Sequence, residues 1–222
     1  MNDLISRAER FARVCHEGQF RKGKAKEPYT IHLEEVANLV EKWGGKDNAI
    51  AAAWLHDTVE DCPPISLADL ATLFGDEIAG IVAELTDDKS LPKAERKRKQ
   101  VENASHKSND ASLVKLADKT SNVGAIGKSP PVDWSLERRL AYLNWANEVV
   151  ELLPFTPKEG LDEFFKRYDI AELDVYDDLG TIRQGENAAL RVIERRAKRL
   201  GASNHKIKQM MLGFMQDAYG KA

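Results

Sequence analysis

The feature that most constrains this chain is a helical spacing of apolar residues that continues over almost its whole length. Near the N-terminus, Leu4, Ala8 and Phe11 are spaced by four and three positions, which places them on one face of a helix. We find no alternation of apolar and polar residues long enough to predict a β-strand. The sequence therefore predicts an all-α fold, an irregular multi-helix cluster rather than an up-and-down bundle.

Glycine, proline and capping residues divide this pattern into separate helices. Gly18 ends the first helix, and Pro63-Pro64 must end the third, because proline clashes with a continuing helix. Ser66 followed by Asp69 resembles a capping box at the start of the next helix. The predicted helices span residues 4–15, 31–40, 48–60, 66–74, 76–85, 92–103, 110–123, 135–153, 161–168, 187–200 and 205–219.

The length and the proline positions suggest a division of the chain. Its 222 residues are enough to bury a core without disulfides. Pro154 and Pro157 interrupt the helical pattern, so we predict one domain at residues 1–154 and a helical C-terminal extension at 155–222. We expect the extension to pack on the core or to make an oligomer contact, and to carry no essential catalytic group. A homo-oligomer is left open.

Composition excludes several classes of function. The net charge of −3 gives no global indication of nucleic-acid binding. Cys15 and Cys62 are too few for a disulfide framework, and reduced cysteines are typical of the cytoplasm. The N-terminal segment lacks the apolar stretch of a signal peptide, and no apolar run approaches the length of a membrane span. We therefore predict a cytoplasmic protein without a nucleic-acid or membrane partner.

The most informative segment is AAAWLHDTVEDC, where an apolar helix ends in ionisable side chains. Residues three and four apart on a helix are neighbours, so His56, Asp57, Glu60 and Asp61 are expected to form one polar patch. Burying such groups is costly unless something pairs with them, and a divalent cation would do so. The alternative is a solvated acidic helix end.

Two further segments favour the metal. His32 in PYTIH begins a predicted helix, and Asp118 in KLADKTSN interrupts an apolar helix face with a carboxylate. Together with His56 and Asp57 they offer two imidazoles and two carboxylates, a set that suits one Mn²⁺ ion, with Fe²⁺, Zn²⁺ or Co²⁺ allowed by geometry. Four such ligands would leave octahedral positions for water or substrate.

The order H…HD…D resembles the signature of the HD phosphohydrolase superfamily. Within it, HEGQFRKGKAKEPYTIH, WLHDTVED, ELTDDKSLPKAERKRKQ and KLADKTSN look like the hydrolase domain of the RelA/SpoT alarmone enzymes, and most of all like the stand-alone small alarmone hydrolases, which include metazoan SpoT homologues. The likeness covers about residues 4–153. It implies a metal-dependent (p)ppGpp 3′-pyrophosphohydrolase that releases pyrophosphate and GDP or GTP. The chain is too short to hold a synthetase domain as well.

The resemblance also implies roles for individual side chains. It implies that Glu60 and Asp61 form a catalytic pair that orients the attacking water and accepts its proton. The plainer alternative is that both acids only balance nearby lysines. The side chains implied to contact the substrate are Arg21, Lys22, Lys93, Asn122, Arg138 and Tyr142.

Some positions depart from the family, and other functions remain. The family commonly has leucine and an aromatic residue or histidine where this chain has Thr120 and Ser121, and often arginine where it has Gly124. We place these positions near the expected nucleotide pocket. The alternatives are the same chemistry on a ppApp-type alarmone or on the 2′-phosphate of NADPH, and a non-catalytic HD module that senses a nucleotide. The complete set of ligand types and acids argues against the last.

Overall fold

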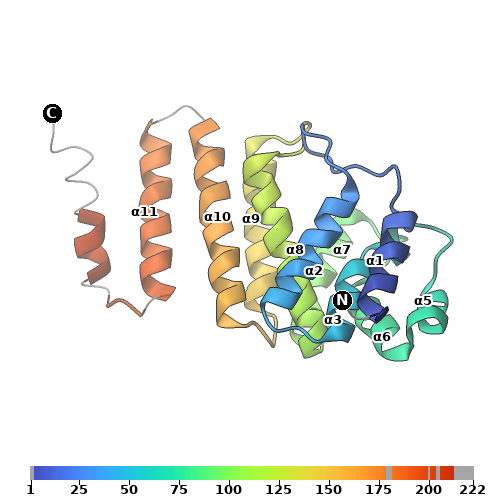
Figure 1. Cartoon of the computed structure of the whole chain (residues 1–222). Coiled ribbons are helices and arrows are strands. Elements are labelled where there is room, and N and C mark those ends of the chain that lie inside the picture. Colours follow the sequence, from blue (N-terminus) through green and yellow to red (C-terminus); the bar gives the residue numbers. More distant parts are fainter. Residues whose placement is uncertain (1–2, 179–181, 200, 204–205, 213–222) are drawn as a thin grey trace.

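The computed structural model describes residues 3–178, 182–199, 201–203 and 206–212, and it confirms the all-α prediction (Figure 1). Within these residues there is no β-strand, only two isolated bridges, which join Phe20 to Pro28 and Gly23 to Pro131. Nor does any described helix have the length and apolar character needed to cross a bilayer.

The helices form an irregular cluster at the N-terminal side, and the helices that follow Pro157 stand side by side at the other side (Figure 1). Residues 206–212 are also helical, whereas the rest of the predicted helix at 205–219 lies outside the described residues. The elements are α1 (Asp3–Cys15), α2 (Tyr29–Lys42), α3 (Asp47–Leu55), α4 (Thr58–Asp61), α5 (Leu67–Phe74), α6 (Asp76–Leu85), α7 (Lys93–Glu102), a 3₁₀ turn (Ala104–His106), α8 (Asn109–Lys128), α9 (Leu136–Glu151), α10 (Lys158–Asp178) and α11 (Ile182–Arg199).

Helix α3 lies at the centre of the N-terminal cluster. Its residues from Ala49 to Leu55 are all buried, and it packs against α1, α2, α6 and α8. A helix that is apolar on every side can exist in water only when other helices surround it. The small side chains of Ala51, Ala52 and Ala53 let those neighbours come close, so the end of α3 is delivered into the middle of the protein.

The single helix predicted at 48–60 is wrong in one respect. Helix α3 ends at Leu55, His56 and Asp57 form a turn, and α4 begins at Thr58. The turn departs from helical geometry at Asp57, where φ is −102° and ψ is −2°. The two candidate ligands therefore occupy a bend between helices, and spacing along one continuous helix does not describe how they are oriented.

Helix α10 is much longer than the predicted helix at 161–168, and it packs along α8. Phe164, Tyr168 and Ala171 of α10 belong to the same buried core as the N-terminal helices. The start of the predicted extension thus shares the core of the first domain. The domain boundary after residue 154 stays a prediction. Helix α11 is held to α10 through Arg195, whose guanidinium contacts Asp169 at 2.7 Å and Glu172 at 2.9 Å.

A glycine on each helix makes the close packing of α8 and α10 sterically feasible. A Cβ atom at Gly127 of α8 would lie 3.2 Å from Cα of Ala171, which is tighter than ordinary contact. A Cβ atom at Gly160 of α10 would lie 2.7 Å from Cδ2 of Leu116. Larger residues at either position would separate the two helices.

We therefore expect Gly127→Leu to lower the free energy of unfolding by about 1–3 kcal/mol, because the new side chain overpacks the interface. Urea denaturation measures this change. The control is Gly80→Leu on α6, an exposed helical position where a Cβ atom meets nothing within 4 Å. That variant should be unchanged or more stable by up to about 1 kcal/mol, because leucine favours the helix more than glycine does. Equal unfolding midpoints for the two variants would contradict the packing described here.

Candidate active site

Four side chains from three parts of the chain converge beside the end of α3. They are His32 in the first turn of α2, His56 and Asp57 in the α3–α4 turn, and Asp118 in the middle of α8. His32, His56 and Asp118 each offer one ligand atom, and these atoms all lie within 4.8 Å of one another. Asp57 Oδ2 is 3.1 Å from His56 Nε2 and 3.7 Å from His32 Nε2. Atoms bound at about 2.1 Å around a common ion stand about 3 Å apart when adjacent, so the distances suit a metal centre.

Hydrogen bonds fix the orientation of these groups. His56 Nδ1 donates to the backbone oxygen of Ala53 at 2.7 Å, which leaves Nε2 facing the cluster. That Nε2 atom is buried and has no hydrogen-bond partner, although it is 3.1 Å from the Asp57 carboxylate. The hydroxyl of Tyr29 donates to Asp57 Oδ2 at 2.6 Å. A buried nitrogen that faces carboxylates without a hydrogen bond is what a metal ligand requires, so the residues fit a divalent cation.

The electrostatics of the two histidines differ sharply. Burial, together with the charges of Arg21 and His56, lowers the pKa of His32 to about 3, so its ring is neutral at pH 7. Burial also opposes the charged form of His56, but Asp57 and Asp118 outweigh it and raise its pKa to about 9. The same site that holds a proton on His56 would hold a cation in its place, because both are stabilised by the two carboxylates.

The two acids implied to be catalytic lie on α4, one turn beyond the cluster. Glu60 Oε1 accepts a hydrogen bond of 2.6 Å from the backbone N–H of Asp87. The ammonium group of Lys89 lies 2.7 Å from Asp61 Oδ1 and 3.5 Å from Glu60 Oε2. Burial, the largest effect, raises the pKa of Glu60 above its ordinary value, and the charges of Asp57 and Asp87 add to it. Both acids therefore balance a lysine, as the plainer alternative expected.

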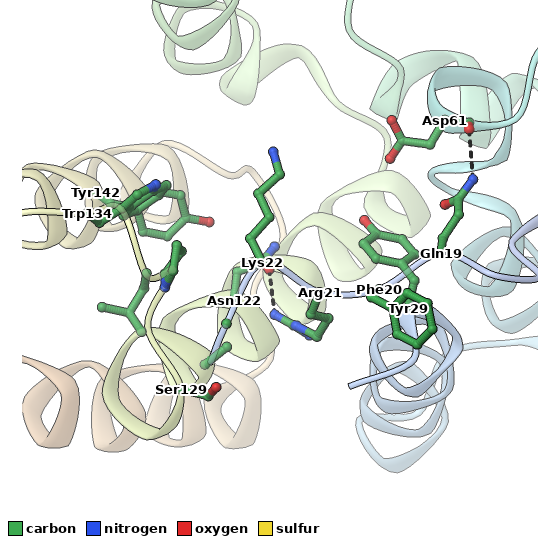
Figure 2. A pocket seen from close by; sticks show the side chains of 14 residues that line it. Gln19, Phe20, Arg21, Lys22, Tyr29, Asp61, Asn122, Ser129, Trp134 and Tyr142 are labelled. Atoms are coloured by element: carbon green, nitrogen blue, oxygen red, sulfur yellow. Dashed lines mark hydrogen bonds between the residues drawn. The ribbon is translucent and has the colours of Figure 1, made fainter. Parts of the chain in front are cut away.

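A cavity of about 550 Å³ opens beside the cluster. Arg21 and Lys22 of the α1–α2 loop, Asp61 of α4, Asn122 of α8 and Tyr142 of α9 all line it. Figure 2 shows the Lys22 side chain extended across the opening between Tyr142 on one side and Asp61 on the other. The cavity thus joins a cationic loop, a carboxylate and an aromatic wall.

Hydrogen bonds connect this cavity to the cluster. Arg21 Nη2 donates to Asn122 Oδ1 at 3.0 Å, and Asn122 Nδ2 donates to Asp118 Oδ1 at 2.5 Å. The structure therefore brings Asn122 beside both the candidate metal ligands and the cavity.

Lys93 and Arg138 do not line the cavity directly. They lie over its aromatic wall, with Lys93 Nζ 5.6 Å and Arg138 Cζ 4.5 Å from the centre of the Trp134 ring. Next to them, Lys97 Nζ stands 4.4 Å from the ring centre of Trp145. Burial and the neighbouring Lys93 and Lys119 lower the pKa of Lys97 to about 8. These cations make a positive rim around the aromatic wall.

Sequence reasoning missed several residues of the site. Gln19 and Tyr29 line the cavity, and Lys89 links the two acids. The signal for Tyr29 was its position three residues before His32, which places both side chains on one face of the first turn of α2. No comparable signal existed for Lys89, because the α6–α7 loop brings it to α4 across 28 positions of sequence.

The positions that depart from the family do not line the cavity. Thr120 is buried and its hydroxyl donates to the backbone oxygen of Leu116 at 2.7 Å. Ser121 is also buried, and its hydroxyl lies 2.9 Å from His32 Nδ1. Gly124 faces the side chain of Arg167 on α10. Ser121 nevertheless accepts a hydrogen bond of 3.3 Å from Arg21, which does line the cavity, so the location of these positions near the nucleotide pocket stays a prediction.

Comparison with known proteins agrees with this geometry. The HD-domain family matches residues 8–142 of the chain. The guanosine-3′,5′-bis(diphosphate) 3′-pyrophosphohydrolase MESH1 of Xenopus tropicalis is 44% identical over 173 residues, which cover 76% of this chain and 96% of that protein. The enzyme of the same name from Drosophila melanogaster is 41% identical over 71% of this chain and 90% of its own length.

A solved structure has the same fold. It is described as a metazoan orthologue of SpoT that hydrolyses ppGpp and plays a role in starvation responses. The TM-score is 0.71 at 38% sequence identity, with 77% of this chain and 98% of that structure covered. The family match covers more than half of this chain, and the relatives are matched over nearly their whole length. The resemblance based on the motifs is thereby confirmed, and the chain belongs to the HD-domain family, in the group that contains the MESH1 proteins.

Proposed function

We propose that this protein is a metal-dependent (p)ppGpp 3′-pyrophosphohydrolase. In this reaction the oxygen of a water molecule bonds to the phosphorus next to the 3′ oxygen, and the bond from that phosphorus to the 3′ oxygen breaks. The 3′ oxygen takes up a proton, so ppGpp and water yield GDP and pyrophosphate, and pppGpp yields GTP and pyrophosphate. The observation that carries the proposal is the convergence of His32, His56, Asp57 and Asp118 beside a cation-lined cavity of nucleotide size.

The proposal assigns one divalent ion, Mn²⁺, to these four residues. Two imidazoles and two carboxylates without a thiolate favour this metal over a structural zinc site. When bound, such an ion offsets phosphate charge and acidifies a water molecule. The hydrogen bonds from His56 to Ala53 and from Tyr29 to Asp57 orient two of the ligands, which supports the assignment because partners of this kind are typical of metal-binding residues.

Glu60 and Asp61 are assigned to the attacking water. The raised pKa of Glu60 brings its carboxylate nearer to the operating pH, which suits a group that accepts a proton. The hydrogen bond from the Asp87 backbone holds Glu60 Oε1, so Oε2 is the oxygen left to act. Lys89 bridges both acids and keeps them oriented toward one another.

The cations around the cavity are assigned to the phosphates of the substrate. Arg21 donates to Asn122, which in turn donates to Asp118, and this supports assigning Arg21 to the diphosphate that is cleaved. Lys22 extends across the cavity and Lys93 and Arg138 lie at the Trp134 wall, where the second diphosphate would be held. Tyr142 and Trp134 offer flat surfaces for the ribose and the base.

We also propose that the enzyme works in the cytoplasm, without a nucleic-acid or membrane partner. Cys15 and Cys62 are both free thiols, which supports a reducing compartment. A homo-oligomer stays a prediction, and size-exclusion chromatography with light scattering would test it.

The first experiment is a substrate panel with Mn²⁺ present. We expect ppGpp to be converted to GDP and pyrophosphate faster than ppApp is cleaved or NADPH loses its 2′-phosphate, with products separated by anion-exchange chromatography. The Glu60→Gln variant serves as the control for contaminating phosphatases. Faster release of phosphate from NADPH would move the assignment to that substrate, and binding of ppGpp without turnover of any compound would favour a sensing module.

Removal of the metal should abolish activity. We expect a chelator to stop turnover and Mn²⁺ to restore it best, and we expect His56→Ala or Asp57→Ala to lose the bound metal, measured by elemental analysis of dialysed protein. The matched control is His106→Ala, because His106 is exposed and does not belong to the cluster of possible ligands. Full activity together with a parental metal content in His56→Ala would refute the proposed centre.

The role of the acids is tested by Glu60→Gln and Asp61→Asn. We expect metal and substrate binding close to those of the parent, and turnover lower by roughly 10²–10⁴-fold, because the base for the attacking water is removed. Glu77→Gln on the exposed face of α6 is the control for a lost carboxylate. Near-normal turnover in both variants would leave Glu60 and Asp61 only as partners of Lys89, and loss of metal would make them ligands.

A further inference from the structure

A chain of hydrogen bonds leads from the candidate ligand His32 away from the cavity to helix α10. His32 Nδ1 lies 2.9 Å from the hydroxyl of Ser121. That hydroxyl donates to Glu35 Oε2 at 2.5 Å, and Glu35 Oε1 accepts from Nη1 of Arg167 at 2.5 Å. The four residues come from α2, α8 and α10, so the chain crosses the interface between the predicted domain and its extension.

The direction of each bond follows from the chemistry of the groups. If His32 Nε2 binds the metal, its Nδ1 carries the ring proton and donates to the Ser121 oxygen. The Ser121 hydroxyl then has its own proton free to donate to Glu35, whose two oxygens both accept hydrogen bonds when the carboxyl is ionised. Burial raises the pKa of Glu35, but the hydrogen bonds from Ser121 and Arg167 and the charge of Arg167 outweigh it, so the carboxyl is ionised.

We propose that Glu35 and Arg167 are positioning residues of the metal centre, which act on His32 through Ser121. The inference rests on the proposed function in so far as His32 is taken as a ligand. It makes α10 part of the working site, although α10 lies beyond residues 8–142, where the family match ends. Neither residue lines the cavity, so their effect reaches the reaction through Ser121, which contacts the His32 ring at 2.9 Å and Arg21 at 3.3 Å.

The path of Arg167 supports a specific role. Its side chain runs over Gly124 of α8, where a Cβ atom would lie 3.2 Å from Cδ and 3.3 Å from Nη1 of Arg167. The glycine therefore leaves the space that lets the guanidinium reach Glu35. Ser121, which lies between Glu35 and His32, is also constrained, because it is buried and accepts a longer hydrogen bond of 3.3 Å from Arg21.

An ordinary ion pair between helices is the competing explanation. Arg167 has a second carboxylate partner, Glu163, one turn earlier on α10, with Nε 2.8 Å from Glu163 Oε1. If Arg167 only stabilised the packing of α10, losing either carboxylate would change the stability of the protein and leave its affinity for Mn²⁺ unchanged. If it serves the metal centre, only Glu35 matters, because only Glu35 contacts Ser121. The two partners of Arg167 thus provide a matched comparison within the molecule.

The experiment measures the dissociation constant of Mn²⁺ by titrating chelator-treated protein. We expect Glu35→Gln, Ser121→Ala and Arg167→Met each to weaken Mn²⁺ binding by roughly 10–100-fold, the usual effect of losing a residue that holds a ligand. Glu163→Gln should leave the affinity close to that of the parent. The double variant Glu35→Gln with Ser121→Ala should be no weaker than the weaker single variant, because both changes interrupt the same chain.

A second measurement tests orientation directly. Nitrogen NMR of the His32 ring reports which nitrogen carries the proton, and we expect the Nδ1-protonated tautomer to lose population in Glu35→Gln but not in Glu163→Gln. Parental Mn²⁺ affinity in Glu35→Gln and Arg167→Met, or equal losses in Glu163→Gln, would overturn the proposal. Because neither measurement uses a substrate, a failure of the alarmone assignment would leave these results unaffected.

Discussion

The rest of the structure depends on one constraint, the burial of several ionisable groups around the end of α3. The two oxygens of Asp118 show how the constraint is met. Oδ1 faces His32 at 3.6 Å and accepts a hydrogen bond from Asn122, whereas Oδ2 faces Lys119 at 3.3 Å and Lys115 at 3.8 Å. The lysines hold one side of the carboxylate and leave the other for a cation. Without such partners a charge buried this deeply would neutralise or the site would open to water.

The helices around this centre divide the work between apolar packing and polar contact. Helix α3 is almost wholly apolar and carries the chain into the interior, and the turn at His56 and Asp57 ends it where polar groups are needed. A straight helix through residue 61 would turn His56 and Asp57 to faces about 100° apart, since each residue rotates a helix by that angle. The bend instead brings both side chains to one point, 3.1 Å apart.

Features that depend on local sequence patterns could be predicted, whereas contacts between distant parts of the chain could not. Part of the candidate ligand set could be found from local patterns, because a carboxylate such as Asp118 is costly within an apolar helix face. The helix positions could be predicted because the spacing of apolar residues is also a local pattern. The break after Leu55 could not be predicted, since the residues there have no strong helix-breaking propensity and tertiary packing decides the outcome. The pairing of Glu35 with Arg167 could not be predicted either, because the two residues are 132 positions apart and look like ordinary surface charges in the sequence.

The packing of α10 on α8 indicates what the C-terminal helices contribute. An extension that only covered apolar surface would need apolar side chains against α8, and α10 does supply Phe164 and Ala171. The small residues Gly124 and Gly127 on the opposing helix let the two helices approach closely, since a Cβ atom at Gly127 would already lie 3.2 Å from Cα of Ala171. The glycines bring α10 close enough for the guanidinium of Arg167 to contact Glu35 beside Ser121. The close packing of α8 and α10 therefore buries the shared core and also makes possible the contact through which we propose that α10 positions His32.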